Sequence, residues 1–171
     1  MKQVIDEKEG RKAFPPYPLA LVTIPGSPPN IITAALIHVF SFEPLQIGIG
    51  IAPTRYSYEL LKVASGFVVN IPTKELLDHV VFCGTKSGRD VNKFEKTRLT
   101  DVPAQTVEAP LIAECPVNFE CEITQIIETG DHHWFIGEVK VIHKDMNFSR
   151  ENALCYWAGE FRLPGTLLRH R

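Results

Sequence analysis

The chain has 171 residues, of which 44% are hydrophobic and 22% charged, and its formal net charge at pH 7 is −2. These values are typical of an ordinary globular protein, and we expect residues 1–171 to form a single domain. The nearly neutral charge excludes the basic surface that nucleic-acid binding or electrostatic attachment to a membrane requires.

The sequence also bears on cellular location and on metal binding. No apolar run approaches the ~20 residues that cross a bilayer, and charged residues follow Met1 too closely for a secretory signal. We therefore expect a cytoplasmic protein without membrane contact. The four cysteines form no Cys-x-x-Cys pair and lie at no zinc-like spacing from the six histidines. We expect no metal site and no disulfides.

The first part of the chain is typical of short strands. Residues 1–13 are polar, which predicts an edge or an arm, and a proline-rich stretch at 14–18 follows. The β-branched run 19–24 predicts a strand and residues 25–29 predict a rigid turn. Residues 30–42 are again rich in strand-forming residues, so a second extended stretch is expected there.

Residues 45–52 alternate strictly between two kinds of side chain. Every second residue from Leu45 to Ile51 is a large aliphatic one, which predicts a core-facing side. The other side carries Gly48 and Gly50, and glycine within a strand is costly unless something approaches the backbone closely. Two explanations are open: a flat ligand or facing strand lies on the bare side, or this is the tight interior of a barrel.

Short helices are predicted in the next part of the chain. Helical spacing of apolar residues predicts a helix over residues 56–64. A second helix is predicted over residues 73–82, with Thr73 as its N-cap, and a short turn of helix is expected near 91–95. Residues 97–114 contain several breakers and are expected to be mostly loop.

A buried strand at residues 67–70 and a later β-hairpin complete the prediction. Residues 117–127 alternate between apolar and polar side chains, which predicts a strand with one face in the core and one in water. Residues 129–131 turn the chain, and residues 133–142 return it. The tail, residues 160–165, is assigned no element. Many short strands with a few helices indicate a mainly β barrel or sandwich.

Two clusters of residues have the chemistry that binds anions. The loop 87–90 combines serine, glycine and arginine, and Lys93 lies just beyond it. Glycine lets backbone N–H groups face an anion, and arginine binds phosphate with two hydrogen bonds. Arg55 and Ser57 offer the same groups at the start of the first predicted helix. The alternative is a solvated turn whose neighbouring arginine and aspartate side chains pair at the surface. The spacing is not that of a Walker loop.

His132 and His133 lie at the predicted hairpin turn. Adjacent strand residues point to opposite faces, so the two rings are not expected to share a metal ion. Two interpretations of His132 are open, a solvent-facing histidine and a hydrogen-bond donor to a ligand. No partner is predicted for the remaining histidines, which are His38, His79, His143 and His170.

In the order of its motifs, the chain resembles the flavin reductase-like proteins, and in particular the flavoredoxin branch. The resemblance covers roughly residues 15–145 in one collinear order. It rests on the segments PNIITAA (29–35), RYSYEL (55–60), FVVNIP (67–72), CGTKSGRDVNKF (83–94), ECPVNFEC (114–121) and GDHHWFIGEV (130–139).

The resemblance implies an FMN-binding split β-barrel with Greek-key topology, usually a homodimer with one FMN per subunit near the interface. It implies that residues 30–35 run along the flavin, that residues 55–57 hold the phosphate or ribityl chain, and that the loop 87–93 and the hairpin histidine add contacts. The cofactor-binding residues expected in this chain are Asn30, Thr33, Ala34, Ala35, Arg55, Tyr56, Ser57, Ser87, Gly88, Arg89, Lys93 and His132.

The function expected from this resemblance is that of an FMN-dependent oxidoreductase, such as an NAD(P)H-dependent flavin reductase. Lys93 is expected near the flavin ring, where its charge favours the reduced form, and the small residues Ala34, Ala35, Gly48 and Gly50 are expected to give the ring or a facing strand room.

Two other functional classes are open. One is an electron carrier that receives electrons from a redox protein partner and lacks a nicotinamide site. The other is a related barrel that holds haem or a deazaflavin, or that acts only as a binding module.

Overall fold

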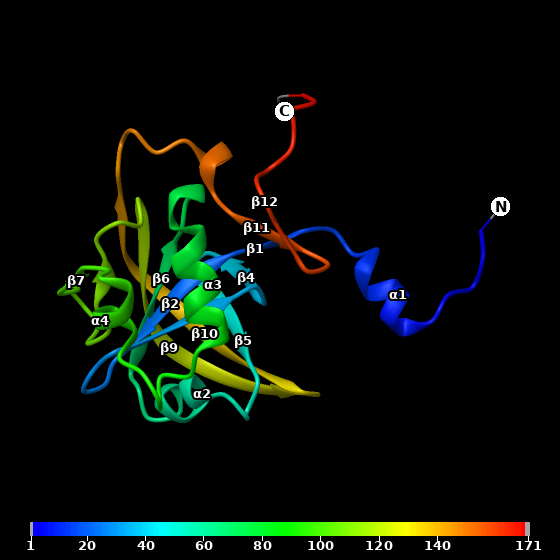
Figure 1. Ribbon diagram of the computed structural model, residues 1–171. Coiled ribbons are helices and arrows are strands. Elements are labelled where there is room, and N and C mark those ends of the chain that lie inside the picture. Colours follow the sequence, from blue (N-terminus) through cyan, green and yellow to red (C-terminus); the bar gives the residue numbers. More distant parts are fainter. Residues whose placement is uncertain (1, 170–171) are drawn as a thin grey trace.

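A computed structural model of the protein describes residues 2–169 (Figure 1). His170 lies outside the described residues. The main element is a seven-stranded antiparallel sheet with the strand order β3-β2-β6-β9-β10-β5-β4. Its strands are β2 (Ala20–Ile24), β3 (Asn30–Ala34), β4 (Ile37–Phe42), β5 (Leu45–Ile51), β6 (Gly66–Ile71), β9 (Val117–Thr129) and β10 (His132–Lys144).

The connection between β3 and β4 shows that this sheet is rolled up. These strands occupy its two opposite edges, although only Ala35 and Leu36 separate them in sequence. The three residue steps from Ala34 to Ile37 span at most about 11 Å, so the two edges must lie next to each other. The β4–β5 ladder extends into this connection, because the backbone N–H of Gly50 in β5 donates to the Leu36 carbonyl at 2.7 Å. The predicted mainly β split barrel is confirmed, and residues 30–42 form two strands rather than one.

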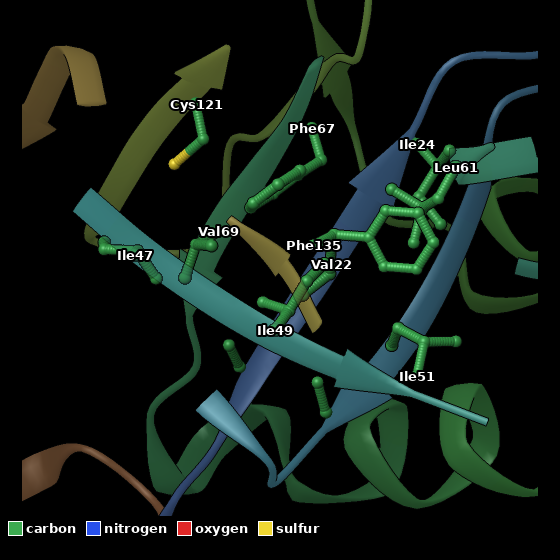
Figure 2. Packing of buried hydrophobic residues seen from close by; sticks show 12 residues of the cluster. Val22, Ile24, Ile47, Ile49, Ile51, Leu61, Phe67, Val69, Cys121 and Phe135 are labelled. Carbon is green, nitrogen blue, oxygen red and sulfur yellow. The ribbon is translucent and has the colours of Figure 1, made fainter. Parts of the chain in front are cut away.

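The apolar side of β5 faces the inside of the barrel, as its alternation predicts. Ile47, Ile49 and Ile51 are buried and pack in one cluster with Phe67 of β6 and Phe135 of β10. Figure 2 shows these side chains pointing toward one another from strands that are distant in the sequence. The prediction that Cys121 fills the core is confirmed, because its side chain lies fully buried in the same cluster.

The bare side of β5 faces outward and is covered by side chains of the same chain. A Cβ atom at Gly48 would overlap the ring of Phe40, and one at Gly50 would lie 2.9 Å from Leu36 Cβ. The Phe40 ring packs in turn on Trp134, with ring centroids 5.2 Å apart. Of the occupants expected on this side, a ligand ring or another strand, the structure places side chains of β4 and of the residue before it, and the tight interior is not the explanation. The two glycines make room for side chains on the outer face.

Helices cover the outside of the sheet near β2 and β3 (Figure 1). Leu21 and Ile31 form a second buried cluster with Val80, Cys83 and Phe94. The predicted helices are present with shifted bounds, and the second is preceded by a 3₁₀ turn. They are α2 (Tyr56–Leu61), η1 (Lys74–Leu76), α3 (Leu77–Thr85) and α4 (Lys93–Thr97).

The polar face of β9 is in water only along part of the strand: Glu122 and Thr124 are exposed as predicted, but the first half of this face is covered. Glu120 is fully buried and Asn118 is nearly so. They are covered by the segment that contains the short strands β7 (Asp101–Val102) and β8 (Leu111–Ile112), in a region expected to be mostly loop. Further along, β9 and β10 form the predicted hairpin, whose tight turn places Gly130 at a φ of 37°.

The two ends of the chain meet outside the barrel in a small three-stranded sheet, β1-β11-β12. Beyond it, the helix α1 stands away from the barrel and buries none of its residues (Figure 1). The sequence assigned neither this helix nor a hairpin in the tail. The elements are α1 (Glu7–Lys12), β1 (Tyr17–Pro18), η2 (Arg150–Asn152), β11 (Cys155–Trp157) and β12 (Glu160–Arg162). No helix within residues 2–169 has the length and apolar character needed to cross a membrane.

Candidate functional site

A polar cavity of about 150 Å³, here called the first cavity, lies between β3, the start of α2 and the loop after α3. Six of the predicted site residues line it, so the two anion-binding clusters seen in the sequence meet in space. These six are Arg55, Tyr56, Ser57, Ser87, Gly88 and Lys93. The remaining lining residues are Ile32, Thr54, Cys83, Gly84, Thr85 and Lys86, which were not predicted.

Asn30 lies behind Ser57 and orients its hydroxyl group. The Asn30 side-chain amide donates to the Ser57 hydroxyl oxygen at 2.9 Å, and both residues are buried. Because this oxygen accepts the amide hydrogen, the Ser57 O–H remains available to donate into the cavity. Asn30 is not among the residues that line the cavity, so its connection to the cavity runs through Ser57.

Gly88 is required by the close approach of its backbone to Asn30. A Cβ atom at Gly88 would overlap the Asn30 amide oxygen and would lie 3.1 Å from Tyr56 Cδ1. That amide oxygen is buried and has no hydrogen-bond partner within the described chain. The loop after α3 thus packs directly against Asn30, the residue that orients Ser57.

Lys93 supplies a buried positive charge at the same cavity. Its side chain is only 3% exposed, and its Nζ donates to the backbone carbonyls of Ile31 at 2.6 Å and Cys83 at 2.8 Å. An ammonium group has three donors, so one remains for a ligand. Burial lowers the pKa of Lys93 to about 8, partly opposed by the Cys83 thiol and reinforced by the charge of Arg55. An anion in the cavity would raise the pKa of Lys93 again and so keep its side chain charged.

The cysteines offer no reactive thiolate at this site. Burial raises the pKa of the Cys83 thiol to about 11, although the nearby Lys93 charge lowers it somewhat. The thiol that lines the cavity is therefore protonated at neutral pH.

Arg89 and His132 lie outside the first cavity. The Arg89 guanidinium forms a surface ion pair with Glu59, rather than with Asp90 as the alternative from the sequence had it. It lies 5.3 Å from the centre of the Tyr56 ring. His132 is at the tip of the β9–β10 hairpin, where its Nδ1 lies 2.9 Å from a carboxylate oxygen of Asp131.

Two further histidines have partners that the sequence did not reveal. The Tyr58 hydroxyl lies 2.9 Å from Nδ1 of His133. His143 Nε2 lies 2.7 Å from a carboxylate oxygen of Glu120. His133 thus links the hairpin to α2, whereas His143 links the two strands of the hairpin, and neither lines the first cavity.

A second, mainly apolar cavity of about 390 Å³ adjoins the first and shares Gly84 and Thr85 with it. Thr33 of β3 and Ala35, which directly follows this strand, both line the second cavity. Ala34 points the other way, into the barrel core. The Thr33 hydroxyl donates to the Val80 carbonyl at 2.6 Å, so it can offer a ligand only its oxygen.

Two aromatic residues of the C-terminal hairpin complete the second cavity. Tyr156 and Phe161 line it and pack edge to face, with ring centroids 5.5 Å apart. Sequence reasoning missed both because it assigned no element to the tail. The only signal was the Ala158-Gly159 pair, a turn sequence between aromatic residues, and it is weak.

The two adjoining cavities suit a ligand with an anionic end and a flat apolar part. The first supplies three cationic side chains, Arg55, Lys86 and Lys93, and the Ser57 hydroxyl, and the second supplies apolar and aromatic walls. Across residues 2–169, no group of three or more His, Cys, Asp or Glu side chains is arranged to hold a metal ion. The fold and the site define a split β-barrel protein with a positively charged cavity beside its edge strand β3.

Comparison with known proteins identifies the family. Residues 13–164 match the family described as Flavin reductase like domain, and the chain belongs to it. The resemblance recognised in the sequence is thereby confirmed. An uncharacterized protein of Archaeoglobus fulgidus is 42% identical over 132 residues, which cover 75% of each chain.

Two further relatives have described activities. The flavoredoxin of Desulfovibrio vulgaris (Miyazaki F) superposes with a TM-score of 0.87 and 27% identity, covering 99% of this chain and 97% of its own. The NADH-dependent FAD reductase of Streptomyces globisporus is 27% identical over 149 residues, which cover 80% of this chain and 78% of the reductase. The family thus includes both flavoredoxins and NADH-dependent flavin reductases.

Proposed function

We propose that the protein is an FMN-binding oxidoreductase that passes electrons from NADH or NADPH through bound FMN to a flavin or protein acceptor. The observation that carries this proposal is the pair of adjoining cavities, one cationic and one apolar, along the edge strand β3. When bound, FMN would supply the electron-transfer chemistry through its isoalloxazine ring.

The first cavity fits the phosphate end of FMN. Arg55 and Lys93 supply positive charge, and the Ser57 hydroxyl and the backbone around Gly88 supply hydrogen-bond donors. Charge-assisted bonds of this kind are about twice as strong as neutral ones. Arg89 is exposed and already paired with Glu59, so we assign it a smaller contribution than Arg55.

The second cavity fits the flat part of FMN. The side chains of Thr33 and Ala35 form one wall and those of Tyr156 and Phe161 form another. As a sheet edge, β3 also presents backbone N–H and C=O groups that a heterocycle can bind. Lys93 lines only the first of the two cavities, which supports a role in holding the phosphate more than a role in tuning the ring.

A second candidate is an electron carrier with bound FMN and no nicotinamide site of its own. The similarity to the Desulfovibrio flavoredoxin supports it, as the similarity to the Streptomyces NADH-dependent reductase supports the enzyme. The two candidates differ in one requirement. Only the enzyme must admit a nicotinamide ring to the flavin.

We further propose that the protein forms a homodimer through the outer face of β4. This edge strand exposes Val39, Phe40 and Phe42, the last with 83% of its surface in solvent. Neighbouring large apolar side chains on an exposed edge are typical of an interaction surface. A second copy of the chain is the occupant that the resemblance implies.

Titration and reduction test these proposals in sequence. Protein freed of ligand by dialysis is titrated with FMN, and saturable quenching of flavin fluorescence is expected. NADH and NADPH are then added to the FMN-loaded protein without oxygen. Bleaching of the yellow colour supports the enzyme, and no bleaching supports the carrier. A flat FMN titration contradicts both.

A further inference from the structure

The C-terminal hairpin, formed by β11 and β12, contributes one wall of the second cavity although it lies outside the barrel (Figure 1). Tyr156 of β11 and Phe161 of β12 line this cavity and pack on each other edge to face. Every residue of β12 is exposed, and in the described part of the chain this strand pairs only with β11. The position of the aromatic wall therefore depends on what holds β11.

The N-terminal segment that precedes β2 runs alongside β11. In β1, Tyr17 lies opposite Tyr156 in an antiparallel pair. At the start of the hairpin, the Leu19 N–H donates to the Leu154 carbonyl at 3.3 Å, and the Leu154 side chain is buried in one cluster with Val80. This end of the hairpin is thus fixed to the barrel by backbone and side-chain contacts together.

The other end of β11, next to the turn, is held by Trp157. Its indole N–H donates to the backbone carbonyl of Lys12 at 3.1 Å. Within residues 2–169, this is the only hydrogen bond between a hairpin side chain and the N-terminal segment. The Arg162 guanidinium of β12 lies 5.3 Å from the centre of the Trp157 ring, a favourable cation–π contact. Trp157 therefore connects both strands of the hairpin to the N-terminal segment.

Trp157 and Tyr156 lie on opposite faces of the hairpin. As neighbours in one strand, they point their side chains to opposite sides. Tyr156 lines the second cavity, whereas Trp157 and Cys155 line a separate cavity on the other side. A contact that holds the outer side chain also fixes the backbone from which the inner side chain projects. Trp157 can thus fix the position of Tyr156 without touching a ligand in the second cavity.

We propose that Trp157 is a positioning residue for the flavin ring. Its bond to the N-terminal segment holds the hairpin against the second cavity and so determines how closely Tyr156 and Phe161 approach the ring. The inference rests on the proposed function, which assigns the ring to this cavity. Loss of the indole N–H should weaken ring binding and leave the phosphate contacts unchanged, because the first cavity is lined by no residue of the hairpin.

The variant Trp157→Phe tests this role, because it removes the N–H and keeps an aromatic side chain. Fluorescence titration of the full chain compares FMN with riboflavin, which carries the ring without the phosphate. Since one neutral hydrogen bond is lost, both ligands are expected to bind about three- to tenfold more weakly. The ratio of their two affinities, which measures the phosphate contribution, should stay as in the wild type.

The matched control is Lys12→Ala. The bond from Trp157 uses the backbone carbonyl of Lys12, which this variant keeps, and the Lys12 side chain is exposed. Lys12→Ala should therefore bind FMN and riboflavin as the wild type does. An equal loss of affinity in the control would show that the lysine side chain, rather than the indole bond, is responsible, and would overturn the inference.

Amide hydrogen exchange tests the same contact without any ligand. In the ligand-free Trp157→Phe protein, exchange in residues 154–162 should be faster than in the wild type, because the hairpin opens more readily. Exchange in β6, at the centre of the barrel, should not change. A merely structural role of Trp157 would instead speed up exchange in both places.

The outcomes separate this inference from the proposed function. Hairpin exchange that is equal in wild type and Trp157→Phe overturns the inference, as does unchanged FMN affinity in the variant. A changed ratio of FMN to riboflavin affinity also overturns it, since the residue would then act on the whole site. A flat FMN titration of the wild type contradicts the proposed function, and faster exchange confined to the variant's hairpin would still support the role of Trp157 in holding the aromatic wall.

Discussion

The side-chain amide of Asn30 donates a 2.9 Å hydrogen bond to the hydroxyl oxygen of Ser57, and both side chains are almost completely buried. Asn30 begins β3 and Ser57 lies in the first turn of α2, so one bond joins the edge strand to the helix that borders the first cavity. Because the Ser57 oxygen accepts this bond, the bond also orients the hydroxyl proton of Ser57. The FMN site that we propose depends on this arrangement.

Removal of the Ser57 hydroxyl should weaken FMN binding. A hydrogen bond to a charged acceptor contributes about 1.5–3 kcal/mol, so Ser57→Ala is expected to raise the FMN dissociation constant by roughly 10- to 100-fold. Asn30→Ala should have a smaller effect in the same direction, because the hydroxyl remains but is no longer oriented. Fluorescence titration measures both. The exposed Ser65→Ala is the control, and wild-type affinity in Ser57→Ala would contradict the phosphate assignment.

Gly88→Ala tests the contact behind that hydroxyl. The added methyl group would overlap the buried Asn30 amide oxygen, so Asn30 must move away from Ser57. We expect weaker FMN binding, by roughly tenfold, from the loss of one oriented donor. Gly165→Ala is a suitable control, since no atom lies within 4 Å of its added methyl group. FMN binding as tight as in the wild type would show that the loop and Asn30 are not coupled.

Local patterns predicted the parts of the fold that depend on one strand at a time. The alternation in β5 determined which of its side chains enter the core, because strand geometry alone decides that. The same reasoning failed for Glu120. This residue occupies a polar position in the alternation of β9, which predicts that it faces water. What buries it is the segment containing β7 and β8, and no strand periodicity shows which distant segment covers a face.

The candidate site was predictable only where its residues carry distinctive chemistry. Arg55, Ser57 and Lys93 are recognisable as anion-binding residues, and they do meet in one cavity. Tyr156 and Phe161 lie in a short hairpin of irregular sequence, and nothing local to them indicates a ligand. The sequence did contain a signal for the helix α1, namely Asp6 as an N-cap residue. Its side chain accepts a hydrogen bond from the Glu9 N–H at 2.8 Å.

The proposed role of Lys93 predicts a pH dependence of FMN binding. Its pKa in the free protein is lowered to about 8, so the ammonium predominates below pH 8 and the neutral amine above it. Bound phosphate favours the ammonium form, hence FMN affinity should fall above pH 8 by up to about tenfold per pH unit. Lys93→Met should bind FMN weakly and with no such decline. An affinity that is constant from pH 7 to 9.5 in the wild type would contradict the contact.

The proposed homodimer predicts a strong effect at the exposed edge strand. Burial of a phenylalanine side chain contributes about 1.5–3 kcal/mol, so Phe42→Lys should weaken dimerisation by at least roughly tenfold. Sedimentation of the purified protein over a range of concentrations measures this. Val63→Lys is a matched control, because Val63 is 86% exposed but follows α2, away from β4. A Phe42→Lys protein that dimerises like the wild type would place the interface elsewhere.

The buried carboxylate of Glu120 should make the stability of the barrel depend on pH in the acid range. Its burial raises its pKa, but hydrogen bonds from the Gln105 N–H, the Thr106 hydroxyl and N–H, and His143 outweigh this and hold the pKa at about 2. The pKa in the unfolded chain is near the usual 4.5. The carboxylate therefore contributes stability above pH 4.5, and this is lost as the pH falls toward 2.

The size of this contribution follows from the difference in pKa. About 2.5 pKa units correspond to about 3 kcal/mol of unfolding free energy. Glu120→Gln keeps the shape but cannot accept all four bonds as a charged group, so it should be less stable than the wild type at pH 7 and similar to it near pH 2. Urea unfolding at several pH values measures the difference. Glu114→Gln is the control, because Glu114 accepts the Thr100 N–H through both oxygens but is exposed, and its replacement should change little. If Glu120→Gln and the wild type lose stability in parallel between pH 5 and 2, the buried carboxylate does not anchor the segment over β9.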